Sequence, residues 1–289
     1  MRWASLAPEA TLWILTAKGM QALAGRSHLC TTPPAIQKFP ICTRPNAHRE
    51  GWELYLGPYA PDYGVLSTLR LTGVAFLAEE PPVDLSESEL YSLFQKAIGH
   101  PVQLMPIRAR DWNEYEALFQ KIKSALSGGR DFERWFDEQK RKLSKLASLA
   151  QRIIHKPAVA FIEPTTPLTI IGSWSTQICA WSGGAPLHKE GGRISLDELL
   201  RIDPEVIVLS VRGGTLRKAG EALAQWARLP HVQGLSAFRQ KRLYAFMGTA
   251  GLFYPSPLTI SAAEGIYELL HTPSYRYNQH IGKLWASLL

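Results

Sequence analysis

Apolar and polar positions alternate with a helical period between Asp131 and Lys156. Apolar residues recur three or four positions apart along this stretch, and no glycine or proline interrupts it before Pro157. Asp131 follows the pair Gly128-Gly129 and can cap the first turn, while proline disfavours the helical region for the residue before it. The pattern predicts one amphipathic helix of about 40 Å. Such a helix either packs on a single core or joins two lobes as a rigid strut.

Short apolar runs alternate with segments of helical period before this helix. The predicted strands are Trp3–Ala7, Val74–Ala78 and Val102–Met105, and Ser27–Cys30 is predicted to form a short strand or a turn. The predicted helices are Leu12–Ala24, Leu66–Leu71, Ser86–Ile98 and Asp111–Leu126. Ser86 and Glu89 have the spacing of a capping box. Breakers mixed with Trp52, Tyr55, Tyr59 and Tyr63 predict an irregular loop between residues 40 and 64.

The same alternation follows the long helix. Buried strands are predicted at Val159–Ile162, Val206–Leu209 and Leu243–Phe246. The predicted helices are one capped by Ser175 or Thr176 and ended by Ser182-Gly183-Gly184, and three more at Ser195–Leu200, 216–227 and 258–270. Strands that alternate with helices imply a parallel sheet covered by helices. We therefore predict an α/β fold with two Rossmann-like lobes, residues 1–126 and 157–289, joined by one long helix within residues 127–156.

Composition narrows the function classes. The chain of 289 residues has 32 Lys or Arg against 25 Asp or Glu, a net charge of +7. Basic groups at residues 140–145 and 239–242 are not interleaved with aromatic residues, which argues against nucleic-acid binding and favours solvated faces. No apolar run is long enough to span a bilayer, and no export signal precedes the first strand. We expect a cytoplasmic protein or an already processed chain.

The three cysteines favour ordinary thiols. Cys30 and Cys42 could pair across a loop, but Cys179 leaves the number odd and no Cys-x-x-Cys motif is present. We therefore expect neither a disulfide framework nor a zinc site.

No catalytic motif stands out. The chain has no nucleophile elbow of the form G-x-S-x-G, no phosphate-binding loop, no H-E-x-x-H and no dinucleotide-binding G-x-G-x-x-G after a strand. His188 could ligate a metal in a cleft or be solvent-exposed. Glu163, at a strand end, could be a base or a structural hydrogen-bond acceptor. His271 ends a predicted helix, where a cation is favoured by the helix dipole. We expect a protein without a catalytic or metal site.

Aromatic residues gather at predicted strand ends instead. Trp174 follows one strand, Phe253 and Tyr254 follow another, and Pro8-Glu9 follow the first. In open α/β sheets ligands bind beyond the carboxyl ends of the strands, and mostly apolar pockets suit a bulky, flat ligand. Each of these aromatic residues could equally pack in a core.

Several stretches together resemble the class III substrate-binding proteins of ABC transporters, which bind cobalamin, iron–siderophores or haem. The stretches are Trp3 to Thr11; Phe161-Ile162-Glu163 with Thr166-Pro167 and Gly172-Ser173-Trp174; Trp181 to Gly184; Ile194 to Val208; Leu235 to Tyr244; and Tyr254 to Pro257 with Leu269-Leu270-His271. They cover most of the second lobe and the start of the first, and the cobalamin-binding subgroup is the most similar.

The resemblance implies two lobes bridged by one rigid helix, with a ligand cleft between them. It implies a monomeric, non-enzymatic, periplasmic importer component that binds a cobalamin-like corrinoid or another metal chelate, siderophore or haem. The candidate ligand contacts are Glu9, Trp174, Phe253 and Tyr254.

The family docks to its membrane subunits through one exposed glutamate on each lobe, and the position that matches in the first lobe is Glu89. In the second lobe the loop after Ser210 is basic, with Arg212, Arg217 and Lys218 before any acid. A basic loop would repel an arginine-rich partner. The alternatives are a cytoplasmic corrinoid or chelate carrier without docking, a chelate-processing enzyme that uses Glu163, His188 and a cysteine, and a pure interaction protein with a filled cleft.

Overall fold

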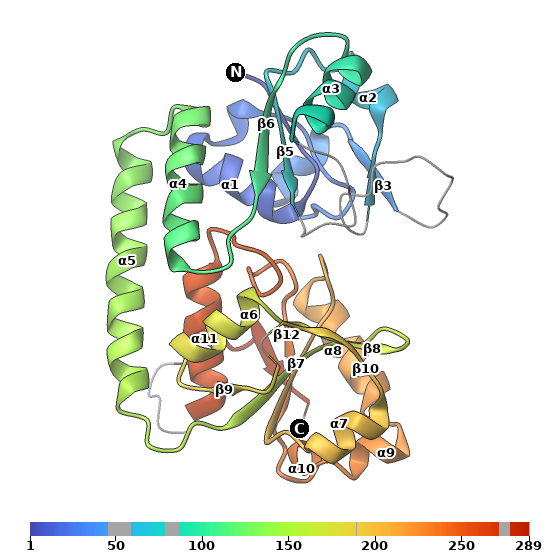
Figure 1. The fold of residues 1–289 in the computed structure, drawn as a ribbon, viewed down its shortest axis with the longest axis vertical. Helices are drawn as coiled ribbons and strands as arrows, with labels where there is room; N and C mark the ends of the chain where they lie inside the picture. The colour runs from blue at the N-terminus through green and yellow to red at the C-terminus, as the bar shows by residue number, and fades with distance from the viewer. Residues whose placement is uncertain (46–58, 79–86, 189, 272–277, 289) are drawn as a thin grey trace. The chain divides into compact units, whose positions relative to one another are not determined.

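The chain forms two compact units. The structure, a computed structural model, describes all residues except 46–58, 79–86, 189, 272–277 and 289. Unit 1 comprises Met1–Trp135 and Tyr254–Pro257, and unit 2 comprises Phe136–Phe253 and Leu258–Leu289. Each unit contains its own sheet (Figure 1). In the described part of the chain, no helix is both long and apolar enough to cross a membrane.

Unit 1 is built on a parallel sheet of four strands in the order β2-β1-β5-β6. The strands are β1 (Trp3–Ser5), β2 (Leu23–Gly25), β5 (Gly73–Leu77) and β6 (Gln103–Ile107). A separate antiparallel pair is formed by β3 (Thr43–Pro45) and β4 (Tyr59–Pro61). All residues of β1, β2 and β5 are buried, as expected for parallel strands covered on both faces.

The helices of unit 1 are α1 (Pro8–Lys18), α2 (Tyr63–Thr68), α3 (Glu87–Ile98) and α4 (Trp112–Leu126), with 3₁₀ turns at Met20–Ala22 and Pro34–Lys38. The Asp111 carboxylate caps α4, accepting from the backbone N–H of Glu114 at 2.9 Å. Ser86, the predicted cap of α3, lies outside the described residues, as do Trp52 and Tyr55 of the central loop.

Of the strand or turn predicted at residues 27–30, the structure has the turn, in which the Cys30 N–H donates to the Ser27 carbonyl at 3.0 Å. The bounds predicted for the first helix were wrong. The first helix starts at Pro8 and ends at Lys18, where Gly19, with a φ of +80°, donates its N–H to the Leu15 carbonyl. Proline is favoured at the first position of a helix, which explains the early start of α1. Because α1 ends at Lys18, the later residues of the predicted helix are available to form β2.

The long helix, α5, spans Arg130–Gln151, about 33 Å. Its first residues belong to unit 1 and the residues from Phe136 onward to unit 2. It ends earlier than its pattern predicted, before Arg152, although proline comes only at 157. Residues 152–157 instead lead into the next strand, where His155 and the Ala158 N–H both bind the Glu205 carboxylate at 2.8 and 2.9 Å.

Unit 2 contains a mixed sheet in the order β10-β8-β7-β11-β12-β13, with β9 paired to β7. The strands are β7 (Ala158–Glu163), β8 (Leu168–Ile170), β9 (Ala185–Pro186), β10 (Gly192–Ile194), β11 (Val206–Ser210), β12 (Leu243–Phe246) and β13 (Trp285–Ser287). The three predicted strands, now β7, β11 and β12, are parallel neighbours. The predicted all-parallel arrangement is incomplete, because the pairs β7–β8, β8–β10 and β12–β13 are antiparallel.

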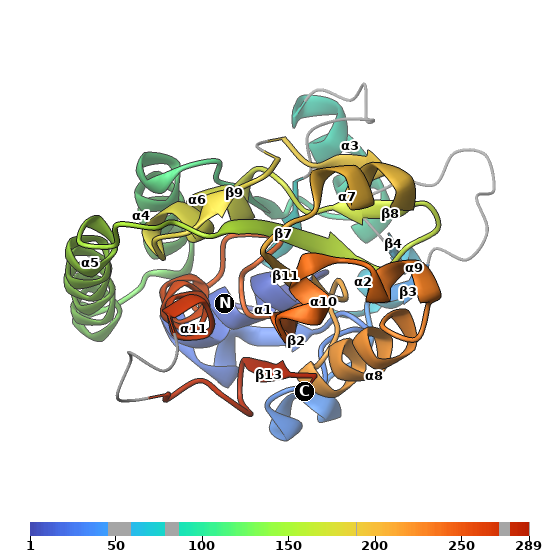
Figure 2. The ribbon, with the colours of Figure 1, turned by 90° about the horizontal axis from the view of Figure 1, so that it is seen from below.

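Helices lie on both sides of this sheet (Figure 2). They are α6 (Trp174–Trp181), α7 (Leu196–Ile202), α8 (Leu216–Trp226), α9 (Pro230–Gln233), α10 (Ser236–Arg239) and α11 (Thr259–His271). Neither Ser175 nor Thr176 caps α6 as predicted, because their hydroxyls donate to the carbonyls of Ile171 and His188. The predicted glycine end of α6 is confirmed: the Gly184 N–H returns to the Cys179 carbonyl at 3.0 Å, with Gly183 at a φ of +75°.

Candidate functional site

The carboxyl ends of the central strands of unit 2 carry the candidate site. Glu163 is the last residue of β7, Arg212 follows β11 by two residues, and Phe253 lies in the loop after β12. Because these three strands are parallel neighbours, their carboxyl ends lie at one edge of the sheet. This edge is where open α/β sheets bind ligands.

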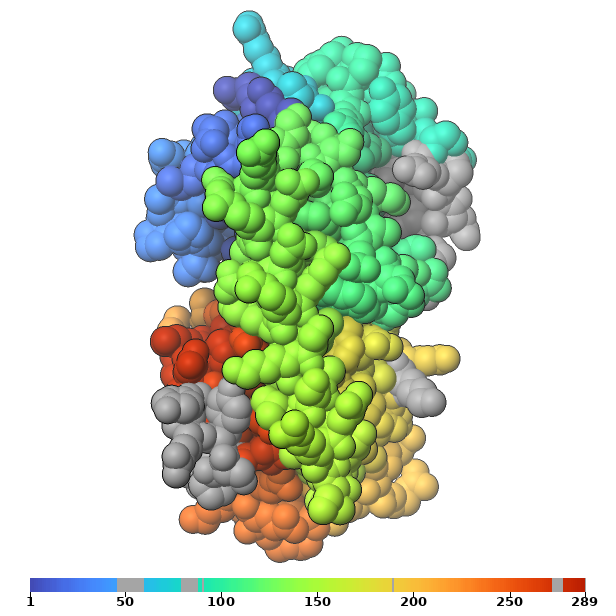
Figure 3. All heavy atoms as spheres, turned by 90° about the vertical axis from the view of Figure 1, so that its left-hand side faces the viewer, coloured from blue at the N-terminus to red at the C-terminus, as the bar shows by residue number. Residues whose placement is uncertain are grey.

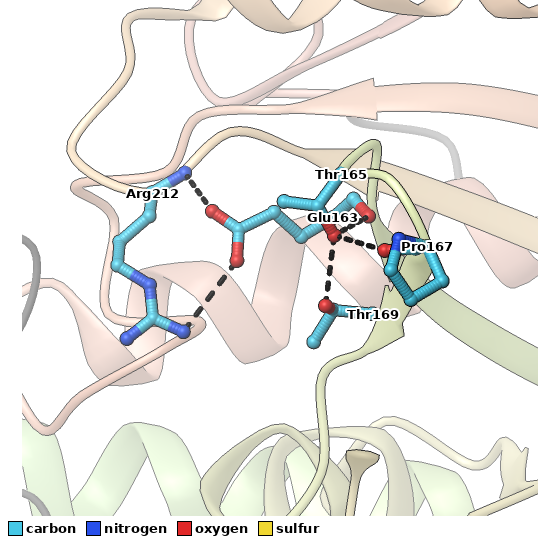
Figure 4. A network of polar contacts seen from close by, with 5 residues as sticks. All are labelled: Glu163, Thr165, Pro167, Thr169 and Arg212. Atoms are coloured by element: carbon cyan, nitrogen blue, oxygen red, sulfur yellow. Dashed lines mark hydrogen bonds and ion pairs between the residues drawn. The ribbon is translucent and has the colours of Figure 1, made fainter. Parts of the chain in front are cut away.

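Glu163 holds Arg212 through two contacts. Its Oε1 accepts the Arg212 backbone N–H at 3.1 Å, and its Oε2 lies 3.5 Å from the Arg212 Nη2 (Figure 4). The Glu163 side chain is 14% exposed and that of Arg212 27%. A partly buried ion pair of this kind is screened less than a surface pair, so it fixes the start of the loop after β11.

The loop after Glu163 is ordered by threonine hydroxyls. Thr165 Oγ1 donates to the Pro167 carbonyl at 2.7 Å and lies 2.8 Å from Thr169 Oγ1 (Figure 4). The Thr165 N–H also donates to the Glu163 carbonyl at 2.8 Å. Hydrogen bonds of this local kind replace the strand ladder and hold the turn between β7 and β8.

Arg212 also stacks on an aromatic ring. Its guanidinium carbon lies 5.1 Å from the centroid of Phe253, which is 8% exposed. A guanidinium over a ring face is a favourable cation–π contact. The Arg212 guanidinium therefore contacts both the Glu163 carboxylate and the Phe253 ring. More than a quarter of the Arg212 side chain is still accessible. Such a guanidinium can bind a carboxylate or stack on a flat ligand.

The Trp174 side chain is not accessible at this edge of the sheet. It is 1% exposed at the first position of α6 and meets the ring of Trp181 edge-on, with centroids 5.6 Å apart. In this arrangement its indole supports the β8–α6 turn and presents no free face to a ligand.

Tyr254 and Phe253 are neighbours in sequence but belong to different units. Tyr254–Pro257 packs with unit 1, where Trp13 Nε1 donates to the Pro255 carbonyl at 3.1 Å and the Tyr115 hydroxyl to the Ser256 carbonyl at 2.8 Å. The Tyr254 side chain is partly exposed. The structure thus groups only Phe253 with Glu163 and Arg212.

Glu9 lies in the first turn of α1 and is 2% exposed. A carboxylate there is favoured by the helix dipole. Close by, Thr11 Oγ1 donates to Ser5 Oγ at 2.7 Å and lies 3.0 Å from Cys30 Sγ. Glu9 is therefore a buried carboxylate of unit 1 and is not grouped with Glu163, Arg212 and Phe253.

Glu89, the candidate docking residue, lies exposed on α3. It lines a shallow groove of about 390 Å³ together with Ser88, Ser92, Leu93 and Lys96. Since this face of α3 is accessible, Glu89 is placed where a partner could reach it.

The residues of the alternative metal site, Glu163, His188 and a cysteine, do not form a ligand cluster in the described part of the chain. No group of three His, Cys, Asp or Glu side chains there could hold a metal ion. All three cysteines are free and buried, so Cys30 and Cys42 do not pair. His188 is half-buried, and its ring Nε2 is buried without a hydrogen-bond partner.

His271 is not the helix-end cation that its position predicted. Burial lowers its pKa below the ordinary 6.5, and Arg242 nearby acts in the same direction, against the hydrogen bond with the Ser182 carbonyl. His271 Nε2 lies 3.0 Å from that carbonyl, so the neutral ring donates its N–H there.

Arg212 is a candidate site residue that the sequence analysis considered only as part of a basic docking loop. The signal that could have identified it was its place two residues after a buried strand, similar to the position of Glu163 at the end of β7. The pairing of the two needed the strand order, which the sequence pattern does not specify.

Comparison with known proteins places this site in a familiar fold. No protein-family model matches the chain, and no curated protein matches its sequence. Among solved structures, a periplasmic haem-binding protein from Pseudomonas aeruginosa is 18% identical with a TM-score of 0.75, over 99% of this chain and 97% of that one.

Two further structures cover similar lengths. The periplasmic haem-binding protein RhuT from Roseiflexus sp. RS-1 is 19% identical with a TM-score of 0.69, over 93% of this chain and 99% of its own. The periplasmic vitamin B12-binding protein BtuF of Vibrio cholerae is 17% identical with a TM-score of 0.70, over 93% and 96%. The chain therefore has the two-lobed α/β fold of these binding proteins, as predicted.

Proposed function

We propose that this protein is a non-enzymatic binding protein for a metal chelate and serves as the substrate-binding component of an importer outside the cytoplasm. The chelate is a haem, a cobalamin-like corrinoid or a siderophore complex. The fold supports the proposal because the similar structures are named for haem or vitamin B12 binding. Fold alone does not specify a ligand, so the argument depends on the site.

The observation that carries the proposal is the Glu163–Arg212–Phe253 group at the strand ends of unit 2. A flat macrocycle needs an apolar surface with a few oriented polar groups. Phe253 and the stacked guanidinium of Arg212 supply such a surface, and Glu163 holds the guanidinium in place.

Ligand binding can be tested by spectroscopic titration of the full chain with haem, cyanocobalamin and a ferric siderophore. Saturable one-to-one binding of one of them is expected. If a well-folded protein binds none of the three, the proposal is overturned.

The role of the site can be tested with Arg212→Gln and a matched control, Arg217→Gln. Arg217 is an exposed arginine of α8 whose ion pair is with Glu221. Loss of a charged hydrogen bond costs about 1.5–3 kcal/mol, so we expect Arg212→Gln to weaken binding by roughly tenfold to a hundredfold. Arg217→Gln should leave it unchanged, and equal effects of the two variants would show that the site lies elsewhere.

Docking is the second part of the proposal and rests on the exposed position of Glu89. Reversal of its charge, Glu89→Arg, should abolish ligand delivery to the membrane subunits without changing ligand affinity. Lys96→Glu, on the same groove, is the control. Unchanged delivery by Glu89→Arg would favour a chelate carrier that does not dock, consistent with the basic residues Arg217 and Lys218 on unit 2.

A further inference from the structure

The net charge of the chain is confined to one unit. Unit 1 has 14 Lys or Arg and 14 Asp or Glu, whereas unit 2 has 18 against 11, so unit 2 alone accounts for the whole +7. The long helix α5 and the five residues after it are divided in the same way. Residues 130–138 contain two basic and four acidic residues, and residues 139–156 contain six basic residues and no acid.

Four of these basic residues form a line on the outside of unit 2. Arg141 and Lys145 lie four residues apart, on one side of α5. Arg152 lies in the turn directly after the last residue of the helix, and Lys156 follows four residues later. All four are exposed. We call these four residues the basic stripe. Figure 3 shows the C-terminal half of α5 uncovered on the surface of this unit.

The described residues offer the basic stripe no acidic partner. Lys142, to one side, pairs with Glu138 at 3.2 Å, and His155 pairs with Glu205 at 2.8 Å. Of the stripe itself, Arg141 only approaches the Asp137 carbonyl at 3.4 Å. In the first half of the helix, by contrast, Arg134 has an ion-pair partner in Asp131. The stripe therefore remains a run of uncompensated positive charge.

A fully exposed apolar residue lies at the end of the basic stripe. Ile154 has a relative exposure of 102%, between Arg152 and Lys156. Cations beside a protruding aliphatic side chain suit a surface that is anionic outside and apolar beneath, which describes a bilayer. A nucleic acid would make no use of Ile154, and the stripe has no exposed aromatic residue for base stacking.

We propose that the basic stripe and Ile154 bind the surface of a bilayer that contains anionic phospholipids. The four cations lie against the phosphate headgroups, and Ile154 enters the boundary between headgroups and acyl chains. This contact is peripheral and reversible, and it keeps the protein close to the membrane independently of any docking through Glu89. It does not depend on which ligand the protein carries.

The test is co-sedimentation of the full chain with phosphatidylcholine vesicles with and without phosphatidylglycerol. We expect binding only to the anionic vesicles, and a steep loss of binding as salt is raised. Each cation near such a surface contributes about fivefold to partitioning, so the variant Arg141→Glu, Lys145→Glu, Arg152→Glu should bind on the order of a hundredfold more weakly or worse.

A second triple variant controls for net charge. Arg201→Glu, Lys218→Glu and Arg228→Glu change three exposed arginines or lysines of unit 2 that are not part of the basic stripe, and the total charge falls equally. This control should keep most of the binding. The substitutions to Gln at 141, 145 and 152 give an intermediate loss, and they serve if the Glu variant is unstable. Ile154→Ser should weaken binding several-fold without altering its salt dependence.

Three results would overturn the proposal. One is an absence of binding to anionic vesicles by the unmodified protein. Another is an equal loss in the two triple variants, which would indicate attraction by total charge. The third is binding of the basic stripe to heparin or to an acidic protein without any binding to the anionic vesicles. Ligand titration of the same variants keeps this test separate from that of chelate binding.

Discussion

The indole Nε1 of Trp13 donates a hydrogen bond of 3.1 Å to the carbonyl of Pro255, 242 positions away in sequence. Trp13 is fully buried in α1, with the ring of Tyr115 at 5.5 Å and that of Trp135 edge-on at 5.9 Å. Tyr115 binds the next carbonyl, that of Ser256. An aromatic cluster of unit 1 thus fixes a segment whose neighbours on both sides, Phe253 and Leu258, belong to unit 2.

Removal of these hydrogen bonds should release this segment. Tyr115→Phe keeps the ring and leaves the Ser256 carbonyl without its donor, so we expect the free energy of unfolding to fall by about 1–2 kcal/mol. Urea denaturation measures it, and proteolysis near residue 254 should become faster. Tyr91→Phe, at an exposed position of α3, is the control. Equal stability of the two variants would contradict the anchoring role.

A buried carboxylate fixes the C-terminal strand. Glu268 of α11 is 1% exposed and accepts three hydrogen bonds, from the N–H groups of Gln279 and His280 at 2.7 and 3.0 Å and from Trp285 Nε1 at 3.0 Å. Glu268→Gln replaces an acceptor by a donor, and we expect a loss of about 2–3 kcal/mol in the free energy of unfolding.

Hydrogen exchange can locate this effect in β13. The amides of Trp285–Ser287 should lose protection in Glu268→Gln more than those of β7. The control is Glu264→Gln, which removes only a partly exposed contact with His280 at 3.4 Å and should cost less than about 1 kcal/mol. If both variants behave alike, Glu268 does not hold the strand.

The sequence was most informative where a strand is buried on both faces. β7, β11 and β12 were predicted to within one residue at each end, because each apolar run begins just after a proline or a charged residue. The marginal strands β8, β9, β10 and β13 were missed. They have two or three residues each, which is too short to show a strand pattern in the sequence.

The site was harder to predict because it depends on neighbours in space. Glu163 and Phe253 were identified by their place after strands, but the partner of Glu163 is 49 positions away. Trp174 packs against Trp181 at the other end of α6, and its position after β8 alone did not predict this burial. The early end of α5 likewise depends on Glu205, which binds residues 155 and 158.

The thiols should be inert in the folded protein. Burial raises the pKa of each of Cys30, Cys42 and Cys179 to about 12. At pH 8 the thiolate fraction is then about one in ten thousand, and the thiolate is the reactive form. We expect no reaction with a thiol reagent such as Ellman's reagent until the protein unfolds, and three thiols per chain thereafter. Rapid labelling of the native protein would show that at least one cysteine is accessible.

Protonation of His271 should destabilise the fold. Burial, assisted by Arg242, holds its pKa below the ordinary 6.5, so the unfolded chain takes up this proton at a higher pH than the folded protein. The contribution of neutral His271 is complete above pH 6.5. It is lost as the pH falls through 6.5 towards the lower folded pKa, because the unfolded state then binds more protons.

The variant His271→Gln isolates this contribution. Its amide can still donate to the Ser182 carbonyl but does not titrate, so the fall in the free energy of unfolding between pH 7 and pH 5 should be smaller than in the unmodified protein. His231→Gln, at an exposed position of α9, should leave the pH profile unchanged. Urea denaturation at a series of pH values measures all three proteins. Since shared carboxylates cancel in the comparison, identical profiles for His271→Gln and the unmodified protein would mean that His271 has the same pKa folded and unfolded.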